Sequence, residues 1–548
     1  MEKGDLQGAP GAGALSPSFL VGSGGGEVTE GFARAVPKLM MAEQRAWGAF
    51  DAHGATVGWR LTCGRIGSQV AESARGPSRS SRMEKTPRRA LLLGSFSAFA
   101  VLACSPEAPE HCTLADPRGS CAEPLVCEAG PAEPLCVAPL IVRGKVSDAG
   151  GNPIADALIT ALDANGAPAS GTAVSGPDGI YELWLPAPRD ADGVPLIRPV
   201  RLRASSAGFE PFPSGLRRSL PIELSGASAS AGRLLLENAA THILLTSIPD
   251  ADGLATIVGT VEAPAGRRGA LVVAEGPVVV TAVSDTDGAF TLFNVPPGVY
   301  EVRGYAAGIQ LLPTSSTVAA GQRLDGLTLA TRDLPLGSVA GNVAIVNAPG
   351  DAATSVVLVV ASTFNQGLAR GEVPPGLRAP GGELAPNVDG AFTIADVPDG
   401  DYVVLAAFEN DDLVRDPDTS IGGTQIQRVT VGPQGRAVTL EAGFKITQAL
   451  AVRHPGAGDL PDLMTGLPSF KWEDDSSEDR YLLEVVDAKG TTVWSTDVPK
   501  QTGGDVSATY TGPPLAAGSL YQFRVTSFRR GDVPISSTED LRGVFAMP

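Results

Sequence analysis

Hydrophobic and polar residues alternate in short stretches along most of this chain. Residues 287–302 read DGAFTLFNVPPGVYEV, in which Phe290 and Leu292 stand two apart among small and polar neighbours. The Asp-Gly pair before them is typical of a tight turn, because glycine adopts a positive φ without a steric penalty. Val-Pro-Pro-Gly makes the next turn, and Tyr300 then begins a second strand with its side chain inward. A period of two, with almost no helical period, predicts short antiparallel strands packed as β-sandwiches.

The same stretch recurs elsewhere in the chain. Residues 389–404 read DGAFTIADVPDGDYVV, at a constant offset of 102, and a third copy opens at residue 178 with DGIYELWLP before a longer insertion. Short apolar strands, such as residues 141–146 and 257–261, precede the copies. Internal repetition of this kind predicts tandem domains of one structural type. The expected core positions are Phe290, Leu292, Val295, Tyr300 and Val302, with Phe392, Ile394, Val397, Tyr402 and Val404 as their counterparts.

The first copy carries a more specific pattern. LIVRGKVSDAGGNPIADALITALDANG, followed by GPDGIYEL, resembles the carboxypeptidase regulatory-like domain, a transthyretin-like β-sandwich. The match to that family's G-x-V-x-D-x-x-G-x-P-I pattern and its D-G-x-Y motif is close in residues 140–186, good in 256–308 and partial in 338–408. The resemblance implies three such sandwiches. We place them at residues 139–248, 252–335 and 336–447.

Residues 450–548 follow a different pattern. Trp472 lies on an early predicted strand, and LAAGSLYQFRV places Leu515, Gly518 and Tyr521 at L-x-x-G-x-x-Y spacing. This resembles the fibronectin type III fold, and the resemblance implies a corner hydrogen bond between that tyrosine and upstream backbone. The sequence therefore predicts an all-β chain that ends in a fourth, fibronectin type III-like sandwich.

A leader-like segment begins at Met83. The basic stretch MEKTPRR is followed by fourteen uncharged, mostly apolar residues. That is shorter than the ~20 residues that span a bilayer but fits the ~7–15 of a signal sequence. The closing Val-Leu-Ala-Cys resembles the lipobox of bacterial lipoproteins, which implies cleavage before Cys104 and a lipid on its sulfur. We therefore expect residues 83–103 to be a signal peptide. A signal anchor with a cytoplasmic tail, or a chance apolar run, is the alternative.

This leader sets the expected location and start of the protein. The resemblance implies an exported protein held by its lipid on the cell envelope, which we expect to be the outer membrane. Residues 1–82 show no sustained period and are expected to be a disordered, mis-called upstream extension, with a genuine cytoplasmic extension as the alternative. Arg88-Arg89 also allows a twin-arginine route. Sec export is favoured, because the downstream cysteines need an oxidising compartment in which to fold.

Four cysteines crowd into the segment 104–138 that follows the leader. Their spacing is C-x8-C-x5-C-x8-C. An even, dense set in an exported protein predicts two disulfides, and all three connectivities remain open. Zinc is the alternative, but the segment has no C-x2-C pair and one histidine, His111. The disulfide cysteines are Cys112, Cys121, Cys127 and Cys136.

The charge of the chain argues against two classes of partner. From Cys104 onward it carries 30 Lys and Arg against 52 Asp and Glu, a net charge of −22. Such an acidic chain repels nucleic acid and anionic lipid headgroups, so no nucleic-acid partner is expected and the membrane is reached through the lipid anchor. The remaining expected partners are a protein or a polysaccharide at the cell surface.

No catalytic or cofactor motif is present. The chain has no H-E-x-x-H, no G-x-S-x-G and no glycine-rich phosphate loop, and His111, His242 and His454 lack a glutamate three residues on. Acidic stretches at 409–418 and 473–479 lack the D-x-D-x-D-G spacing of a calcium loop, so solvated loop ends are expected there. We expect no catalytic residue, no metal and no cofactor. An enzyme remains possible only if a site is assembled between domains.

The sequence favours a surface spacer or interaction scaffold. Carbohydrate or cell-wall binding is the alternative, because the sandwich family groups with carbohydrate-binding-like folds. Sugar platforms usually need exposed aromatic rings. Downstream of the leader the chain has three tryptophans, Trp184, Trp472 and Trp494. Five of its seven tyrosines already occupy predicted core positions: Tyr181, Tyr300, Tyr402, Tyr481 and Tyr521.

Overall fold

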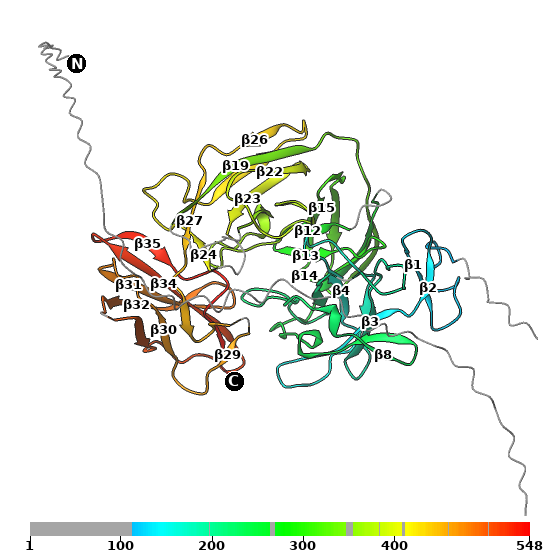
Figure 1. Cartoon of the computed structure of the whole chain (residues 1–548), viewed down its shortest axis with the longest axis horizontal. Coiled ribbons are helices and arrows are strands. Elements are labelled where there is room, and N and C mark those ends of the chain that lie inside the picture. Colours follow the sequence, from blue (N-terminus) through cyan, green and yellow to red (C-terminus); the bar gives the residue numbers. More distant parts are fainter. Residues whose placement is uncertain are drawn as a thin grey trace, which may run out of the picture. The chain divides into compact units, whose positions relative to one another are not determined.

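The computed structural model describes most of the chain from Cys112 onward. The described residues are 112–196, 198–263, 269–346, 354–382, 384–407, 412–458, 460–501 and 503–547. The upstream segment 1–82, the expected leader 83–103 and Cys104 lie outside them. Apart from three single-turn 3-10 helices, regular structure in this part is β-strand (Figure 1). The predicted all-β class is confirmed.

No helix in the described ranges is long and apolar enough to cross a membrane.

The first sandwich has two sheets on one core. The larger sheet has the order β10-β3-β9-β8, with β6 also paired to β3, and the smaller has the order β5-β4-β7. Side chains of both sheets meet in one apolar cluster, in which Leu140, Tyr181 and Leu202 are buried. The strands are β3 Leu140–Ser147, β4 Leu158–Leu162, β5 Ala173–Val174, β6 Ile180–Trp184, β7 Arg201–Ser205, β8 Ser228–Ser230, β9 Arg233–Leu236 and β10 Ile243–Leu244.

The second sandwich packs a sheet of order β14-β11-β18 on one of order β13-β12-β15-β16, with β17 also paired to β15. Ile257 and Leu292 from the first sheet meet Val272 and Val302 from the other in its core. The strands are β11 Ala255–Val261, β12 Leu271–Glu275, β13 Val279–Val283, β14 Ala289–Val295, β15 Gly298–Ala306, β16 Ile309–Gln310, β17 Thr314–Val318 and β18 Arg323–Leu329.

The third sandwich repeats this plan. Its sheets have the orders β22-β19-β27-β24, with β26 on β19, and β21-β20-β23-β25. Val339 and Ile394 from one sheet meet Leu358 and Val404 from the other in its core. The strands are β19 Gly337–Val346, β20 Val356–Val360, β21 Arg378–Ala379, β22 Gly390–Val397, β23 Gly400–Ala406, β24 Leu413–Arg415, β25 Gln427–Val431, β26 Ala437–Thr439 and β27 Phe444–Gln448.

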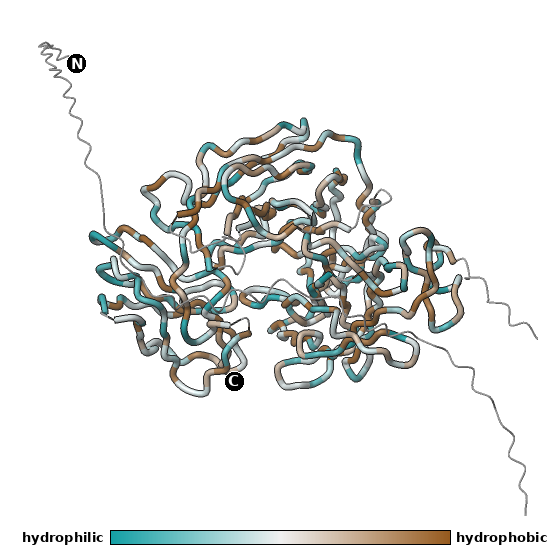
Figure 2. The backbone as a smooth tube through the Cα atoms, viewed as in Figure 1, coloured by the Kyte–Doolittle hydropathy of each residue, from teal (hydrophilic) through white to brown (hydrophobic). Residues whose placement is uncertain are grey.

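The repeat motif forms the same strands in both sandwiches, and Figure 2 shows how closely hydrophobic and hydrophilic residues follow one another along the strands. Tyr300 and Tyr402 are both fully buried. Their hydroxyls donate to the carbonyls of Pro296 and Pro398, at 2.9 and 3.0 Å. The turn that the motif predicts is therefore tied to the strand that follows it.

In the second and third sandwiches a glycine lies under a phenylalanine ring. Gly259 on β11 lies opposite Phe290, and a Cβ there would come within 2.5 Å of the ring. Gly341 stands in the same relation to Phe392, at 2.7 Å. A side chain at these positions would displace the ring from the core. This contact gives a physical reason for the glycine of the G-x-V pattern.

The sheets differ from the prediction in one respect. Most strand pairs are antiparallel, as expected, but the first long strand of each of these three sandwiches also has a parallel neighbour. β11 pairs antiparallel with β14 and parallel with β18. β19 has the same relation to β22 and β26, and β3 to β6 and β9. The chain passes through the second sheet before returning to the far side of this strand, and alternation alone does not encode that path.

The fourth sandwich has sheets of order β28-β30-β33 and β29-β36-β34-β31-β32, with β35 on β34. Trp472 is fully buried in its core. The hydroxyl of Tyr521 accepts a hydrogen bond from the backbone N–H of Ala516 at 2.9 Å, so the expected corner contact forms with the hydroxyl as acceptor. The strands are β28 Val452–His454, β29 Asp462–Leu463, β30 Ser469–Glu473, β31 Arg480–Asp487, β32 Thr492–Pro499, β33 Asp505–Thr509, β34 Leu520–Arg529, β35 Val533–Ser537 and β36 Val544–Ala546.

Candidate functional site

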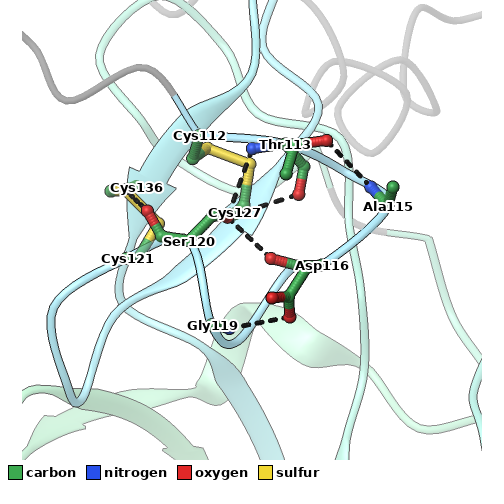
Figure 3. Close-up of a disulfide and its surroundings, with 9 residues drawn as sticks. All are labelled: Cys112, Thr113, Ala115, Asp116, Gly119, Ser120, Cys121, Cys127 and Cys136. Carbon is green, nitrogen blue, oxygen red and sulfur yellow. Dashed lines mark hydrogen bonds between the residues drawn. A yellow bond between two sulfur atoms is a disulfide. The ribbon is translucent and has the colours of Figure 1, made fainter.

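The cysteine-rich segment is built around a two-stranded hairpin of β1 Val126–Glu128 and β2 Leu135–Val137. Two disulfides join its four cysteines, Cys112 to Cys127 and Cys121 to Cys136. Figure 3 shows the first bond and the turn beside it, where the Asp116 carboxylate accepts from the Gly119 N–H at 2.9 Å. Of the three possible connectivities the structure therefore has first to third and second to fourth.

These sulfurs bear on the zinc alternative. Sγ atoms of Cys112, Cys121 and Cys136 lie within 4.8 Å of one another, and no other group of three or more possible metal ligands in the described ranges comes so close together. All three sulfurs are held in disulfides. A thiolate is needed to bind zinc, so this oxidised form offers none.

A buried ion pair ties the cysteine-rich hairpin to the first sandwich. Glu128 accepts from the Arg189 guanidinium at 2.5 Å, and the two side chains are only 2% and 1% exposed. Glu128 also accepts from the Trp184 indole N–H at 3.1 Å, while Arg189 donates to the Ala138 carbonyl at 2.9 Å. Both charges are thus paired and hydrogen-bonded, as burial requires. Neither residue was singled out in the sequence.

Asn294 joins the first sandwich to the second. It lies at φ 59° within β14, a left-handed conformation that asparagine tolerates better than most residues. Its side-chain oxygen accepts from the Gly208 N–H at 2.7 Å. Its amide donates to the carbonyls of Ser206 and Phe209, at 3.2 and 2.7 Å. One side chain therefore satisfies three backbone groups of a turn in the neighbouring sandwich.

The third sandwich uses the equivalent position. Asp396, 102 residues after Asn294, also has a positive φ of 57°. Its carbonyl accepts from the Gly308 N–H at 2.8 Å, in an Ala-Gly turn of the second sandwich. The Ala-Gly turn of one sandwich therefore contacts the same position of the next at both junctions.

Three sandwiches meet at Glu372. Its carboxylate accepts two hydrogen bonds from Arg203 of the first sandwich, both at 3.0 Å, and one from Thr281 of the second, also at 3.0 Å. The Arg203 and Glu372 side chains are 12% and 29% exposed. Burial acts to raise the pKa of the Glu372 carboxyl, but the charge and hydrogen bonds of Arg203 outweigh it and lower the pKa below its usual value. Arg203, Thr281 and Glu372 thus join three sandwiches through one carboxylate, and we call this contact the lock at Glu372.

A second arginine links the third sandwich to two others. The Arg370 guanidinium donates to the carbonyl of Gly215 in the first sandwich at 3.0 Å and to that of Asp540 in the fourth at 2.8 Å. Burial lowers the pKa of Arg370 to about 10, so the group remains charged at neutral pH. Arg524 of the fourth sandwich in turn donates to the Gly367 carbonyl at 2.6 Å. The segment 361–373, which covers one face of β20, thus contacts the first, second and fourth sandwiches.

The two acidic stretches of the sequence meet around a cavity of about 400 Å³. Asp416 is 5% exposed, which differs from the solvated loop end expected there, because the third and fourth sandwiches pack together at this point. Its carboxylate pairs with Lys445 at 2.5 Å. Asp474 accepts from Tyr481, and Asp475 from Ser527, each at 2.7 Å. These oxygens therefore have structural partners.

Another cavity, of about 410 Å³, lies between the first and second sandwiches. Asp148, Ile154, Asp156, Ser206, Phe209 and Phe293 are among the residues that line it. Neither phenylalanine is among the aromatic residues that the sequence offered for a sugar platform, which were tryptophans and tyrosines. The sequence does hold one signal for Phe293: in the repeat motif it follows the inward-facing Leu292, so its own side chain points outward.

The tyrosines themselves build no platform. All seven are buried, and Tyr521, the most exposed, is only 6% exposed. The ring of Trp184 is contacted by the Arg118 guanidinium, 5.2 Å from its centroid. The aromatic residues weighed for a sugar platform therefore serve mainly in cores and contacts between modules.

No protein-family model and no curated protein matches the chain. Similar solved structures include the Bacillus anthracis TIE protein, at 13% identity over 57% of this chain and 53% of that one, with a TM-score of 0.13. This chain thus spans about half the length of that protein. A streptococcal ancillary pilin is 12% identical over 56% of this chain and 99% of its own, with a TM-score of 0.15.

A chlorocatechol 1,2-dioxygenase from Pseudomonas putida is 16% identical over 20% of this chain and 60% of its own, with a TM-score of 0.14. TM-scores this far below 0.5 transfer no activity, partner or location to this chain.

Proposed function

We propose that this protein is a non-catalytic lipoprotein of the cell envelope, held by a lipid on Cys104, whose tandem sandwiches form an interaction scaffold. In this proposal the first three are carboxypeptidase regulatory-like domains, at residues 139–248, 252–335 and 336–447, and residues 450–548 form a fibronectin type III-like domain. The leader pattern and the oxidised cysteine pairs support export.

The observation that carries the scaffold role is the lock at Glu372. A spacer of independent modules would be joined by solvated linkers, whereas here Arg203, Thr281 and Glu372 bring three sandwiches together through charged hydrogen bonds. Such contacts hold binding surfaces of different modules in a constant relation. The partner is proposed to be a protein or polysaccharide at the cell surface, with the outer membrane as the expected location.

The lipid anchor is tested by Cys104→Ser in the full chain. We expect the variant to lose metabolic labelling with a palmitate analogue and to leave the membrane fraction or keep its leader uncut. Cys63→Ser is the matched control, since that cysteine precedes the expected start at Met83. A Cys104→Ser protein that is still labelled, processed and membrane-bound would refute the anchor.

A further inference from the structure

The cavity between the first two sandwiches has the size of a small-molecule site. Its volume of about 410 Å³ lies within the ~300–1,000 Å³ of such pockets. Ser206 and Phe209, whose carbonyls accept from Asn294, both line it. It is therefore supported by the same hydrogen bonds that join the two sandwiches, and the second sandwich closes it with Phe293.

Its apolar wall contains two phenylalanines from different modules. Phe209 and Phe293 are each partly exposed. Phe209 packs against the core of the first sandwich, but Phe293 belongs to none of the apolar clusters of the described residues. The third sandwich has Ala395 at the position equivalent to Phe293. The repeat fold therefore does not need this ring, and its place at the cavity calls for another explanation.

The polar wall is negative. Asp148 and Asp156 are its charged residues, and no lysine, arginine or histidine is among the described residues that line it. Asp156 is exposed, and its carboxylate has no hydrogen bond or ion pair within the described part of the chain. Hydrogen bonds, first from the Asn152 side chain, lower the pKa of Asp148 below its usual value. Two carboxylates therefore face this space.

Ser206 adds a buried polar group. It is 5% exposed and lines the cavity, and its hydroxyl has no partner among the described residues. Its oxygen is not among the fully buried side-chain atoms of the described residues that lack a partner, so the hydroxyl is open to the cavity. A polar group of a ligand could form a hydrogen bond with this hydroxyl.

We propose that this cavity binds a small organic cation, an ammonium group that carries apolar carbons. The carboxylates balance its charge, and the phenyl faces attract cations through their quadrupole while covering the attached carbons. A neutral sugar fits less well, since it must also receive hydrogen bonds and the cavity side chains offer one hydroxyl donor. A metal ion fits less well, since two carboxylates supply few ligands. The proposal is independent of the lipid anchor and of the scaffold role.

Calorimetric titration of the full chain with choline and with n-butylammonium tests this. We expect saturable binding of at least one of them. Asp156→Asn, which removes a charge without breaking a described contact, and Phe293→Ala, which installs the residue of the third repeat, should each weaken it about threefold to thirtyfold. Asp192→Asn and Val299→Ala, at exposed positions outside the cavity, are matched controls and should leave it unchanged.

The choice of probe separates two sources of the same chemistry. Tighter binding of choline would assign the site to quaternary ammonium compounds, and tighter binding of n-butylammonium to primary amines such as a lysine side chain. Absence of saturable binding of both, or equal binding by the parent and both cavity variants, would overturn the proposal. If neither ammonium probe binds, but glucose or Ca²⁺ binds and this binding is lost in Phe293→Ala or Asp156→Asn, the proposal is also overturned. Ser206→Ala gives a further variant should Phe293→Ala fail to fold.

Discussion

Single buried residues determine much of how the modules of this chain contact one another. The Glu128 and Arg189 side chains are almost fully buried, yet their charges are satisfied by one another, by an indole N–H and by backbone. Removing one partner of such a pair leaves an uncompensated buried charge, which costs more than the pair itself contributes. The contact is therefore sensitive to truncation on either side.

Glu128→Ala should destabilise the cysteine-rich hairpin and its contact with the first sandwich by about 3–5 kcal/mol. Hydrogen-exchange mass spectrometry of peptides covering β1 and β2 would report the loss as faster exchange. The matched control is Glu182→Ala, whose partner Arg233 lies 2.9 Å away but whose side chains are 45% and 44% exposed. Exposed pairs contribute at most about 1 kcal/mol, so the control should exchange like the parent. Equal behaviour of the two variants would contradict the buried-pair interpretation.

Single substitutions at Tyr300 test whether the repeat motif places this tyrosine in the core. It is fully buried and donates to the Pro296 carbonyl, so Tyr300→Ala should cost about 3–5 kcal/mol and speed hydrogen exchange in β14 and β15. Tyr300→Phe, which loses only the hydroxyl, should cost about 1 kcal/mol. Val299→Ala changes an adjacent side chain that is 61% exposed, and should have little effect. If Tyr300→Ala is as protected as the parent, this tyrosine is not a core residue.

At the scale of elements, the N-terminal hairpin depends on covalent links. Strands β1 and β2 are three residues each, which is too short to be stable alone, and both disulfides span a separation of 15 residues. Loops of this length gain about 3 kcal/mol from a disulfide in the chain-entropy account. The cysteines therefore replace a hydrophobic core that this segment is too small to form.

We predict that peptide mapping of non-reduced protein will recover Cys112 linked to Cys127 and Cys121 linked to Cys136. The intact mass should be lower than that of the reduced chain by four hydrogens. Reduction should make the hairpin the first segment to lose protection from proteolysis, because it is the part that the disulfides hold. Four free thiols, bound zinc or another connectivity would contradict the structure.

Strands buried on both faces explain how the modules join. In β12 the side chains of Leu271 and Val273 pack with the core cluster of the third sandwich, while Val272 and Ala274 face their own. Tyr305 of the second sandwich meets Tyr402 of the third edge-on, with ring centroids 6.1 Å apart. Apolar area is therefore buried between modules as well as inside them, which favours a constant arrangement over free linkers.

At the scale of the whole molecule, the lock at Glu372 should respond to acid. The Arg203 charge depresses the pKa of this carboxyl in the folded protein, although burial opposes it. A depressed folded-state pKa means that the contribution to stability is present above the unfolded value, ~4.3, and is lost as the pH falls through the folded value. Between neutral pH and about pH 5 the lock should therefore stay closed.

We expect exchange in β7 and β13 to rise selectively in the parent when the pH falls below the ordinary glutamate value of ~4.3, after correction for intrinsic rates. Glu372→Gln should weaken the same contacts at neutral pH. It should also remove the acid step, that is, the selective rise in exchange at low pH. Asp325→Asn, at an exposed pair with Arg323, is the control and should retain the step. An acid step that persists in Glu372→Gln would show that another group governs the junction.

The sequence by itself determined the elements of this protein. Alternation and turn residues located the strands, the offset of 102 identified the repeated motif, and clustered cysteines indicated a disulfide segment. These are local signals, because a period of two reports which face of a strand a residue occupies and Asp-Gly reports a turn. Phe290, Tyr300 and Tyr402 were accordingly assigned to the core correctly.

Only the tertiary structure decided which distant residues meet. Glu128 pairs with a residue 61 positions away and Arg203 with one 169 positions away, and no period or spacing records such a partner. The parallel neighbours of β11 and β19 and the cavity beside Phe293 depend in the same way on how finished sheets pack. A pattern shows whether a side chain turns inward or outward. What it touches there depends on surfaces that exist only after the sandwiches have folded and packed together.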